Sequence, residues 1–442
     1  MNLHALVGAA VTRLWAFIKL LVAAATGPVW STAIATRAWT NHRRAKELTS
    51  RYPDQLTALI EDRQPTGANN EYLVLPSEMR AFVSSDLHRC IPGRIDHSAR
   101  LDTKYLYEAA LDHYADRGFH LIENGDVEDF WMVGGTMEGT RYDISRMAAG
   151  LIPGPFGRRL RTTIRNRQLD QIVDNNLGIY RRIRNRFAAD GRYWRTIGNH
   201  DDVYADPTLR QHLRTHLPGA RPVNHLVLRS RAGSTSAVIT HGHHTDGWNA
   251  PGRANLGRLA SWAACTLTDL PFLSTPEGLP TREESAAILA GTASNSLVAV
   301  DPLFGANRHY DSLDEELLFS AVSPHLDRPP RPWLLFGHTH FPVYEPLSRT
   351  GLTWKRYANS GTGLLWGVVT GLEWDGTGDE PRVQLVAWSW ANDDTAPERI
   401  VSHHRGRAVA RTELVALTDE DGRAVIGPAA SPAETAGQSR PV

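Results

Sequence analysis

The sequence contains little cysteine and little lysine, and each scarcity excludes a class of protein. Its 442 residues include only two cysteines, Cys90 and Cys265. A disulfide framework and a zinc site built on thiolates are therefore excluded, which fits a reducing compartment. The lysines are Lys19, Lys46, Lys104 and Lys355. Nearly all of the basic charge is consequently carried by arginine.

The chain also lacks an excess of charge of either sign. Lys+Arg and Asp+Glu number 48 each, so the formal net charge is zero. A broadly basic nucleic-acid-binding protein is disfavoured by this balance, and no clear nucleic-acid partner is expected. The hydrophobic fraction of 41% is enough for a sizeable core. The length then favours one large domain with appendages.

The first 40 residues lack the uninterrupted apolar run that a membrane-spanning helix requires. Apolar residues recur at helical spacing from Leu3 to Leu21, but Arg13 and Lys19 interrupt them. Charges inside the apolar stretch, with no clear cleavage site, also disfavour a secretory signal. Two interpretations stay open: a helix packed on the domain, or an amphipathic helix on the inner membrane face. We expect a cytoplasmic protein, with peripheral membrane contact through this helix as the alternative.

Short apolar runs alternate with helical stretches from Met79 onward, and the earlier runs end where polar residues begin. This alternation is typical of an α/β domain. We expect strands at residues 80–83, 119–122, 193–197, 237–240, 333–336, 354–357, 364–374 and 383–390. Helices are expected at residues 101–117 and, with many arginines, 157–187.

Shifts in composition suggest how the chain is divided. The expected parts are an amphipathic N-terminal helix (1–40), a helix and linker (41–76), a main domain (77–400) with an inserted cap (246–331), a C-terminal extension (401–427) and a disordered tail (428–442). The expected cap is mixed in pattern and rich in glycine and proline. No internal repeat is present in the sequence.

Candidate metal ligands follow the expected strands. His338 and His340 lie one residue apart behind the apolar run 333–336, so both imidazoles aim at one point beyond the sheet edge. The other strand ends supply Asp86, His88, Asp126, Asn199 and His241. Nitrogen and oxygen donors without a thiolate favour Mn²⁺, Fe or Zn²⁺ over Ca²⁺ or Mg²⁺. One ion cannot use so many donors, and a pair of ions could.

Five motifs occur in order: Asp-x-His, Gly-Asp-x-x-Asp, Gly-Asn-His-Asp, His-Gly-His and Gly-His-x-His, each after an expected strand. In this order they resemble the calcineurin-like metallophosphoesterases, and the resemblance spans about Met79 to Trp374. It implies an α/β fold, a two-sheet αββα sandwich with a dimetal site at the strand-end loops. It also implies hydrolysis of phosphate esters or pyrophosphates on a phosphorylated small molecule or lipid.

The resemblance implies roles for particular residues and two divalent metal ions, most naturally Mn²⁺, with Fe or Zn²⁺ as alternatives. It assigns Asp86, His88 and His340 to the first ion, Asn199, His241 and His338 to the second, and Asp126 to a bridge between them. A water or hydroxide between the ions would be the nucleophile. His200 would be the catalytic histidine, and Asp129 the carboxylate that orients it.

Several alternatives remain open within this chemistry. Asp129-Phe130-Trp131 is similar to the UDP-2,3-diacylglucosamine pyrophosphohydrolases, which typically have arginine where this chain has His200. A nuclease is a further alternative, and so is a non-catalytic scaffold on the same fold. A protein Ser/Thr phosphatase is disfavoured because its Gly-Asp-x-Val-Asp-Arg-Gly and Gly-Asn-His-Glu patterns are absent.

Other polar residues carry weaker expectations. We expect His243, His244 and Asp246 at most to line the pocket. The arginines between residues 158 and 186 favour a solvated helix face, with binding of anionic lipid or a substrate phosphate as the alternative. The remaining histidines considered, His97, His403 and His404, match no motif.

Overall fold

The computed structural model describes much of the chain from residue 50 to residue 428. The described residues are 50–67, 70–93, 95–132, 141–142, 145–146, 148–149, 152–246, 249–251, 258, 261, 281–290, 298–300, 307–309, 313–326, 331–345, 354–392, 395, 397–418 and 424–428. The expected N-terminal helix (1–40), much of the expected cap and the expected tail beyond residue 428 lie outside them. Within the described ranges, none of the helices combines the length and apolar character needed to cross a membrane.

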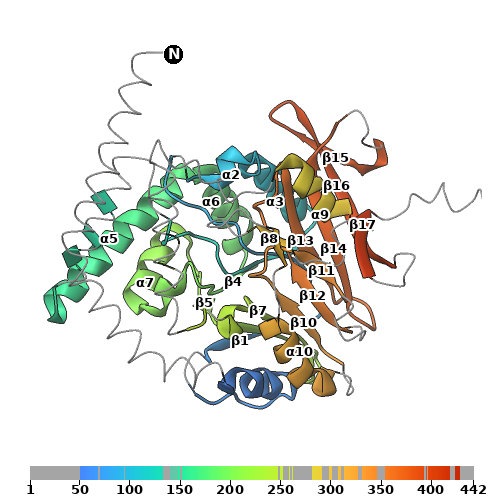
Figure 1. Cartoon of the computed structure of the whole chain (residues 1–442), viewed down its shortest axis with the longest axis horizontal. Helices are drawn as coiled ribbons and strands as arrows, with labels where there is room; N and C mark the ends of the chain where they lie inside the picture. The colour runs from blue at the N-terminus through green and yellow to red at the C-terminus, as the bar shows by residue number, and fades with distance from the viewer. Residues whose placement is uncertain are drawn as a thin grey trace, which may run out of the picture.

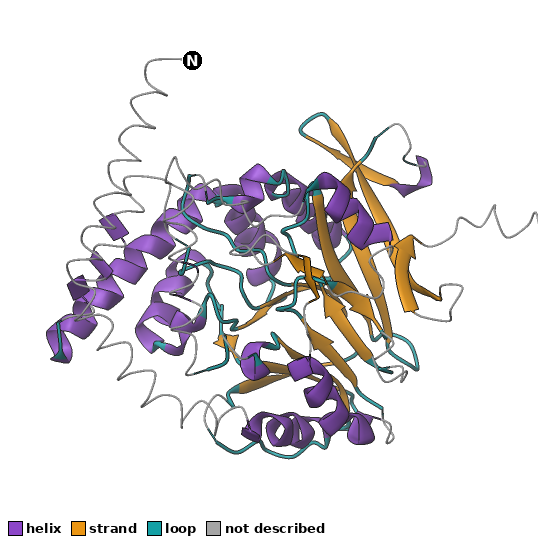
Figure 2. Ribbon diagram, viewed as in Figure 1, coloured by secondary structure: helices purple, strands orange, loops and turns teal. Residues whose placement is uncertain are grey.

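The fold is mixed α/β, with two large mixed sheets and surrounding helices (Figures 1 and 2). The six-stranded sheet has the order β1 (Tyr72–Pro76), β6 (His225–Arg229), β7 (Thr235–Thr240), β10 (Trp333–Phe336), β12 (Tyr357–Ser360) and β11 (Pro342–Tyr344). The nine-stranded sheet has the order β15 (Ile400–His404), β16 (Arg407–Thr418), β14 (Arg382–Trp390), β13 (Val368–Asp375), β2 (Arg80–Ser84), β3 (His120–Asn124), β4 (Tyr193–Thr196) and β5 (Pro222–Val223), and β17 (Ala424–Pro428) pairs with β16. A small hairpin joins β8 (Val298–Val300) to β9 (Asn307–His309).

A hydrophobic core lies between the two sheets. Side chains alternate between the faces of a strand, so each central strand serves two cores. In β2, Ala81 and Val83 join the core that also holds Leu335 of β10, whereas Phe82 faces the opposite side. Because both sheets contribute to this shared core, they pack face to face.

Helices cover the outer face of each sheet. On the nine-stranded sheet these are α3 (Lys104–Asp116), α5 (Gly154–Asn175), α6 (Leu177–Ile183) and α7 (Pro207–His216). On the six-stranded sheet they are a helix at residues 50–60 and α10 (Leu313–Leu326). The shorter helices are α2 (His97–Arg100), α9 (Arg282–Ala290), the π-helix η1 (Arg184–Ala188) and the 3₁₀ turns η2 (Asp202–Ala205), η3 (His243–Thr245) and η4 (Pro397–Arg399).

The strands expected before the polar motifs are confirmed to within two residues, and two other expectations are corrected. The strand expected at 354–357 begins only at Tyr357, because Trp354 instead stacks on Phe319 of α10 with ring centroids 4.7 Å apart. The helix expected at 157–187 is divided into α5, α6 and η1. The division falls at Asn176, whose side-chain amide donates to the Ile172 carbonyl at 2.9 Å.

The sheets extend beyond the limits expected for the main domain. β1 lies inside the segment expected to be a helix and linker, where it pairs in parallel with β6. β16 lies in the expected C-terminal extension and pairs with β14. α10 lies within the expected cap, yet Leu318 and Val322 pack in the core outside the six-stranded sheet. Long-range pairing therefore incorporates segments that composition alone separates.

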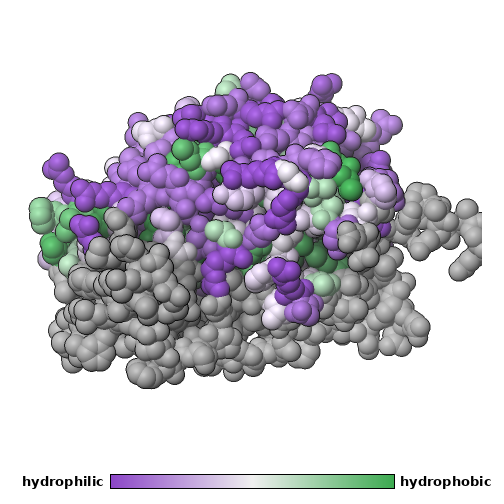
Figure 3. Space-filling model, turned by 90° about the horizontal axis from the view of Figure 1, so that it is seen from above, coloured by the Kyte–Doolittle hydropathy of each residue, from purple (hydrophilic) through white to green (hydrophobic). Residues whose placement is uncertain are grey.

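The face seen in Figure 3 is mainly hydrophilic, with small separate hydrophobic patches among the described residues. The large hydrophobic side chains that are exposed in the described part of the chain are Val74, Tyr105, Phe156 and Leu177. They come from different elements, and scattered exposure of this kind is normal for a folded protein.

Candidate metal centre

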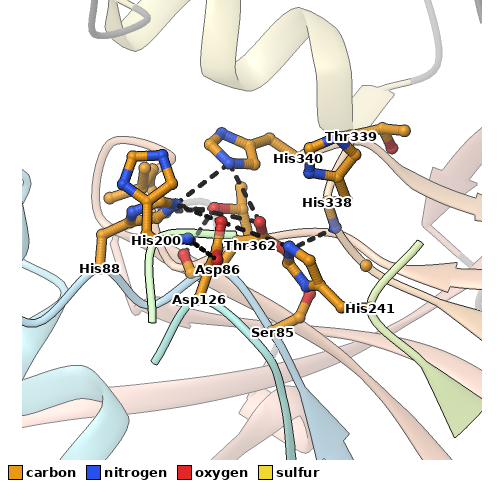
Figure 4. A network of polar contacts seen from close by, with 12 residues as sticks. Ser85, Asp86, His88, Asp126, His200, His241, His338, Thr339, His340 and Thr362 are labelled. Carbon is orange, nitrogen blue, oxygen red and sulfur yellow. Dashed lines mark hydrogen bonds and ion pairs between the residues drawn. The ribbon is translucent and has the colours of Figure 1, made fainter. Parts of the chain in front are cut away.

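The expected ligands lie where strands of the two sheets end side by side. β2, β3 and β4 are parallel neighbours in the nine-stranded sheet, and β7 and β10 are parallel neighbours in the other. Backbone hydrogen bonds hold the loops that follow them together: His88 N donates to Asp126 O at 3.0 Å, and Gly337 N to His241 O at 3.0 Å. Figure 4 shows the side chains from these loops converging. Both sheets thus contribute to one site.

Many of the converging residues have an unusual backbone conformation. The φ angle is positive at Asp86 (52°), His88 (43°), Asp126 (50°), His338 (72°) and His340 (62°). Non-glycine residues avoid this region, and each such residue costs of order 1–3 kcal/mol unless the surroundings impose it. Their concentration at adjoining strand ends indicates that the loops are held in a geometry that directs these side chains inward.

The glycines of two motifs permit close approach. A Cβ atom on Gly198 would collide with the backbone nitrogen and carboxylate of Asp126. Gly125 has a φ of +76°, and a Cβ there would lie 2.5 Å from Nδ1 of His241. Only glycine allows the strand-end loops to pack this tightly around the Asp126 carboxylate.

Asp86, His88 and His340 form the first set of donors. Nε2 of His340 lies 3.1 Å from Oδ1 of Asp86 and 3.3 Å from Nε2 of His88. Asp86 and His88 are buried, whereas His340 is partly exposed. Oδ1 of Asp86 is buried and has no well-aligned hydrogen bond, although Nε2 of His340 lies close to it, and such an oxygen is costly to bury. A cation bound among these three donors would satisfy that oxygen and both imidazole nitrogens, so the residues fit a metal ion.

Asp126, His241, His338 and Asn199 form the second set. The ligand atoms of the first three lie within 4.8 Å of one another. Nε2 of His241 lies 3.3 Å from Oδ2 of Asp126 and 3.2 Å from Oδ1 of Asn199. Nδ1 of His241 lies 2.9 Å from the Asn124 carbonyl, so it is the protonated nitrogen. Burial lowers the pKa of His241, but Asp126 and Asp86 raise it to about 10. A metal ion at this set would therefore displace the proton from Nε2 and take its place between the donors.

The Asp126 carboxylate lies between the two sets. Its Oδ2 is 3.8 Å from Nε2 of His88 in the first set and 3.3 Å from Nε2 of His241 in the second. Its Oδ1 accepts a hydrogen bond from the His200 backbone at 2.8 Å. Burial raises its pKa, but His241 and His200 hold the pKa of Asp126 well below the ordinary value. The carboxylate is therefore charged, and it lies where it could contact a metal ion bound at either donor set.

Asp246 is a functional candidate that sequence reasoning underrated as a pocket residue. Its Oδ2 lies 2.9 Å from Nε2 of His338. The same side chain accepts hydrogen bonds of 3.0 Å from both the backbone and side-chain nitrogens of Asn249. A carboxylate bound to one ring nitrogen fixes the tautomer of an imidazole. When Nε2 donates to Asp246, Nδ1 of His338 is left to bind a metal.

His200 and Asp129 lie beside the donors. Nδ1 of His200 is 2.9 Å from Oδ2 of Asp129, and the ring stacks on Trp131 with centroids 4.2 Å apart. Oδ1 of Asp129 accepts two backbone hydrogen bonds of 2.8 Å, from Trp131 and Met132. Burial lowers the pKa of His200, but the charges of Asp129 and Asp126 raise it to about 9. The ring is thus held in place, and without metal ions it is protonated at neutral pH.

Asp201 joins two of the loops, a role that the Gly-Asn-His-Asp motif did not reveal. Its Oδ1 accepts from the backbone of Gly198 at 2.6 Å, and its Oδ2 accepts from Val127 at 3.0 Å. Arg195 also donates to Oδ2 at 3.2 Å. The motif's terminal aspartate is therefore a brace between the loops after β3 and β4.

Two arginines lie beside the aromatic residues next to His200, Arg258 over the Trp131 ring and Arg146 at the Phe130 carbonyl. The Arg258 guanidinium lies 5.5 Å from the ring centroid of Trp131 and 2.5 Å from the Asp202 carboxylate. Burial, followed by the charges of Arg258 and Arg146, lowers the pKa of Arg165 to about 10, while Asp202 and Asp206 oppose the shift. Arg182 and Arg186 of the same arginine-rich segment instead form ion pairs with Asp112 of α3. These two arginines therefore have a structural role in joining helices.

The remaining histidines take no part in the two donor sets. His243 and His244 are buried behind the site, where the His243 ring lies 5.3 Å from that of His241 and His244 stacks on Tyr52 at 4.2 Å. Neither histidine belongs to a donor set, in keeping with the expectation that they would at most line the pocket. Of the histidines outside all motifs, His97 is buried, His403 is exposed and His404 lies 3.4 Å from Glu108.

Comparison of the sequence with models of known protein families and with curated proteins finds no match in either.

Proposed function

We propose that this protein is a dinuclear metal-dependent hydrolase of phosphate esters or pyrophosphates, built like a calcineurin-like metallophosphoesterase. The observation that carries the proposal is the position of Asp126, a buried carboxylate with one donor set on each side. The face-to-face sheets with helices outside support the αββα sandwich that the motifs imply.

The donors fit two divalent ions, with Mn²⁺ most natural and Fe or Zn²⁺ as alternatives. Asp86, His88 and His340 would hold one ion and Asn199, His241 and His338 the other, with Asp126 shared. When bound, two such ions supply charge neutralisation of the phosphate and activation of water. These oxygen and nitrogen donors suit Mn²⁺, Fe or Zn²⁺ better than Ca²⁺ or Mg²⁺.

The protein's own contribution is positioning and one proton. Asp129 faces Nδ1 of His200, so Nε2 is the nitrogen left to act on substrate. A protonated His200 can give that proton to the leaving oxygen or stabilise charge on the transferring phosphoryl group. Trp131 stacks on this ring and so restricts its rotation. The burial of Asp86 and Asp126 excludes water from the charged groups, which strengthens their interactions.

The arginines near His200 support a phosphorylated substrate. Arg258, which also pairs with Asp202, and Arg165 carry positive charge that would attract an anionic group of the substrate. A phosphorylated small molecule or a phosphorylated lipid both satisfy this requirement. One observation favours the alternative of a UDP-diacylglucosamine-type lipid pyrophosphatase. Trp131, which belongs to the shared Asp-x-Trp pattern, stacks on His200 at the site.

Hydrolysis assays on metal-stripped protein test the proposal. After addition of Mn²⁺, the wild type should hydrolyse a chromogenic phosphomonoester or phosphodiester, and Asp126→Asn should abolish turnover. His200→Ala should lower kcat by about 10²–10⁴-fold, the scale expected of a general acid. His403→Ala, an exposed histidine outside the site, is the matched control.

The outcomes separate the alternatives. The ratio of diester to monoester turnover narrows the substrate class. A protein that binds two metal equivalents without turnover directs the next assay to lipid pyrophosphates. A protein that binds no divalent metal contradicts the proposal and favours the scaffold alternative.

Peripheral membrane contact is a separate proposal that rests on the amphipathic sequence of residues 1–40. Cell fractionation of the full chain and of a chain lacking these residues tests it. Recovery of the full chain entirely in the soluble fraction at low salt contradicts the proposal.

A further inference from the structure

A second cluster of metal-binding residue types lies between helices α5 and α7. It consists of Asp170 on α5 and of His212 and His216 on α7. Oδ1 of Asp170 lies 2.7 Å from Nε2 of His212 and 2.8 Å from Nε2 of His216. The two helices run beside one another in Figure 1, and this cluster connects them.

The geometry of the cluster is specific. His212 and His216 are four residues apart, which places both rings on one face of α7. Their rings meet nearly edge to face, with centroids 5.5 Å apart, and both Nε2 atoms approach the same carboxylate oxygen. Two imidazoles at this helical spacing are a recurrent half of zinc sites.

The surroundings of Asp170 strengthen the case. α5 is rich in arginine, with Arg158, Arg159, Arg161, Arg165 and Arg167. Among the described residues, none of the arginines or lysines forms an ion pair with Asp170, whose partners are the two histidines from the other helix. The side chains are 44%, 25% and 24% exposed, so an ion and a water molecule could reach them.

We propose that Asp170, His212 and His216 bind a divalent transition metal ion of the zinc type, with water as a fourth ligand. Two imidazoles and one carboxylate form a donor set that suits Zn²⁺. Tetrahedral bonds of about 2.0–2.1 Å leave ligand atoms about 3.3 Å apart. The donors now 2.7 and 2.8 Å from the carboxylate oxygen need only small side-chain rotations to reach that spacing.

The bound ion would tie α7 to α5 at the C-terminal end of α7. The opposite end already has a link, since Oγ1 of Thr162 in α5 donates to Oδ2 of Asp206 at 3.3 Å. Asp206 is also the N-cap of α7 and accepts from Thr208 N at 2.9 Å. α7 follows η2, directly after the loop that carries Asn199 and His200. The metal therefore stabilises the helix pair behind that loop, and its binding stabilises the folded chain by mass action.

The experiment removes the donors of the main centre first, so that the two kinds of site are measured separately. The full chain carrying Asp86→Asn, His88→Gln, Asp126→Asn and His241→Gln, which disrupts both donor sets, is stripped of metal and dialysed against Zn²⁺, and bound zinc is measured by mass spectrometry. We expect one equivalent and a rise in Tm. Adding His212→Gln and His216→Gln should remove both the equivalent and the Tm rise, whereas adding His403→Gln should preserve them.

A second variant guards against damage to the fold. Asp170→Asn keeps a hydrogen-bond acceptor between the histidines but removes the charge that a cation requires. When it is added to the chain with the main-centre substitutions, the Tm without zinc should be unchanged. The rise in Tm on addition of zinc should be lost. Unchanged zinc binding in either variant, or no zinc bound by the chain with the four main-centre substitutions, overturns the proposal. Because no assay of hydrolysis enters, this result is independent of the proposed function.

Discussion

Oδ2 of Asp129 lies 2.9 Å from Nδ1 of His200 and also 3.1 Å from Nδ1 of His88. One carboxylate therefore orients both the proposed proton donor and a proposed metal ligand. His88 is left with Nε2 for the metal, and His200 with Nε2 for the substrate. Positioning of the two rings is thus shared through a single side chain.

Asp129→Asn should accordingly weaken metal binding and slow turnover together. Loss of a carboxylate that orients a metal-binding histidine typically costs about 10–100-fold in metal affinity or activity. Mn²⁺ titration and kcat at saturating metal measure the two effects. Asp379→Asn, an exposed substitution, is the control. Loss of affinity with unchanged kcat at saturating Mn²⁺ would contradict the role assigned through His200.

Arg165→Gln should raise KM more than it lowers kcat. Arg165 lies within the electrostatic reach of Arg258, which covers the Trp131 ring beside His200. If Arg165 attracts the substrate, removing an attraction worth about 1.4 kcal/mol weakens binding about tenfold. Steady-state kinetics on a phosphorylated substrate separate the two parameters. The exposed Arg167 of the same helix provides the matched control, Arg167→Gln. Equal KM values for the two variants would show that Arg165 does not attract the substrate.

Removal of metal should lower both activity and thermal stability. Asp86 and Asp126 are buried carboxylates in one site, and a cation compensates their mutual repulsion. Chelation should abolish hydrolysis and lower Tm, and Mn²⁺ should restore both. Asp126→Asn should respond less to the chelator in a thermal scan. An identical Tm with and without chelator in the wild type would count against a metal at this site.

Glu128→Gln should be strongly destabilising. The buried Glu128 carboxylate accepts from Arg195 at 3.1 Å and from Tyr204 at 3.0 Å. Removing one charge from a buried ion pair typically costs about 3–5 kcal/mol, and Asp201, 3.2 Å from the Arg195 guanidinium, remains as its second partner. Denaturant unfolding measures the change. Glu380→Gln, at an exposed position, should leave the free energy of unfolding nearly unchanged. A loss below about 1 kcal/mol for Glu128→Gln would show that the network tolerates a neutral partner.

His113 should make the free energy of unfolding fall in mild acid. Burial against Trp388, followed by the charge of Arg117, lowers the pKa of His113 from 6.5 to about 4. The unfolded chain then binds a proton between these values while the folded chain does not. The resulting loss of stability begins as pH falls below 6.5 and is complete below about 4.

His113→Gln should remove this contribution, and the difference in unfolding free energy between variant and wild type should change over that pH range. Denaturant titrations at several pH values check it. His403→Gln should leave the pH dependence as it is in the wild type. A difference that stays constant between pH 4 and 6.5 would show that His113 is not the group responsible.

The local order of apolar runs and polar motifs in the sequence was enough to predict the central strands and the residues at their ends. Apolar residues 333–336 do form β10, and His338 and His340 follow it. Strand periodicity and glycine positions are local properties, so they can be read from a short stretch of chain. For the same reason the candidate donors could be named before their positions were known.

Only the tertiary structure decided which side chains meet. Asp246 faces His338 across 92 positions in sequence, and Trp131 covers His200. Asp170 meets two histidines of another helix because α5 and α7 pack together. The strands that complete each sheet were likewise set by pairing with distant partners. Such contacts depend on how strands and helices that are distant in sequence pack together. A local pattern of residues does not predict that packing.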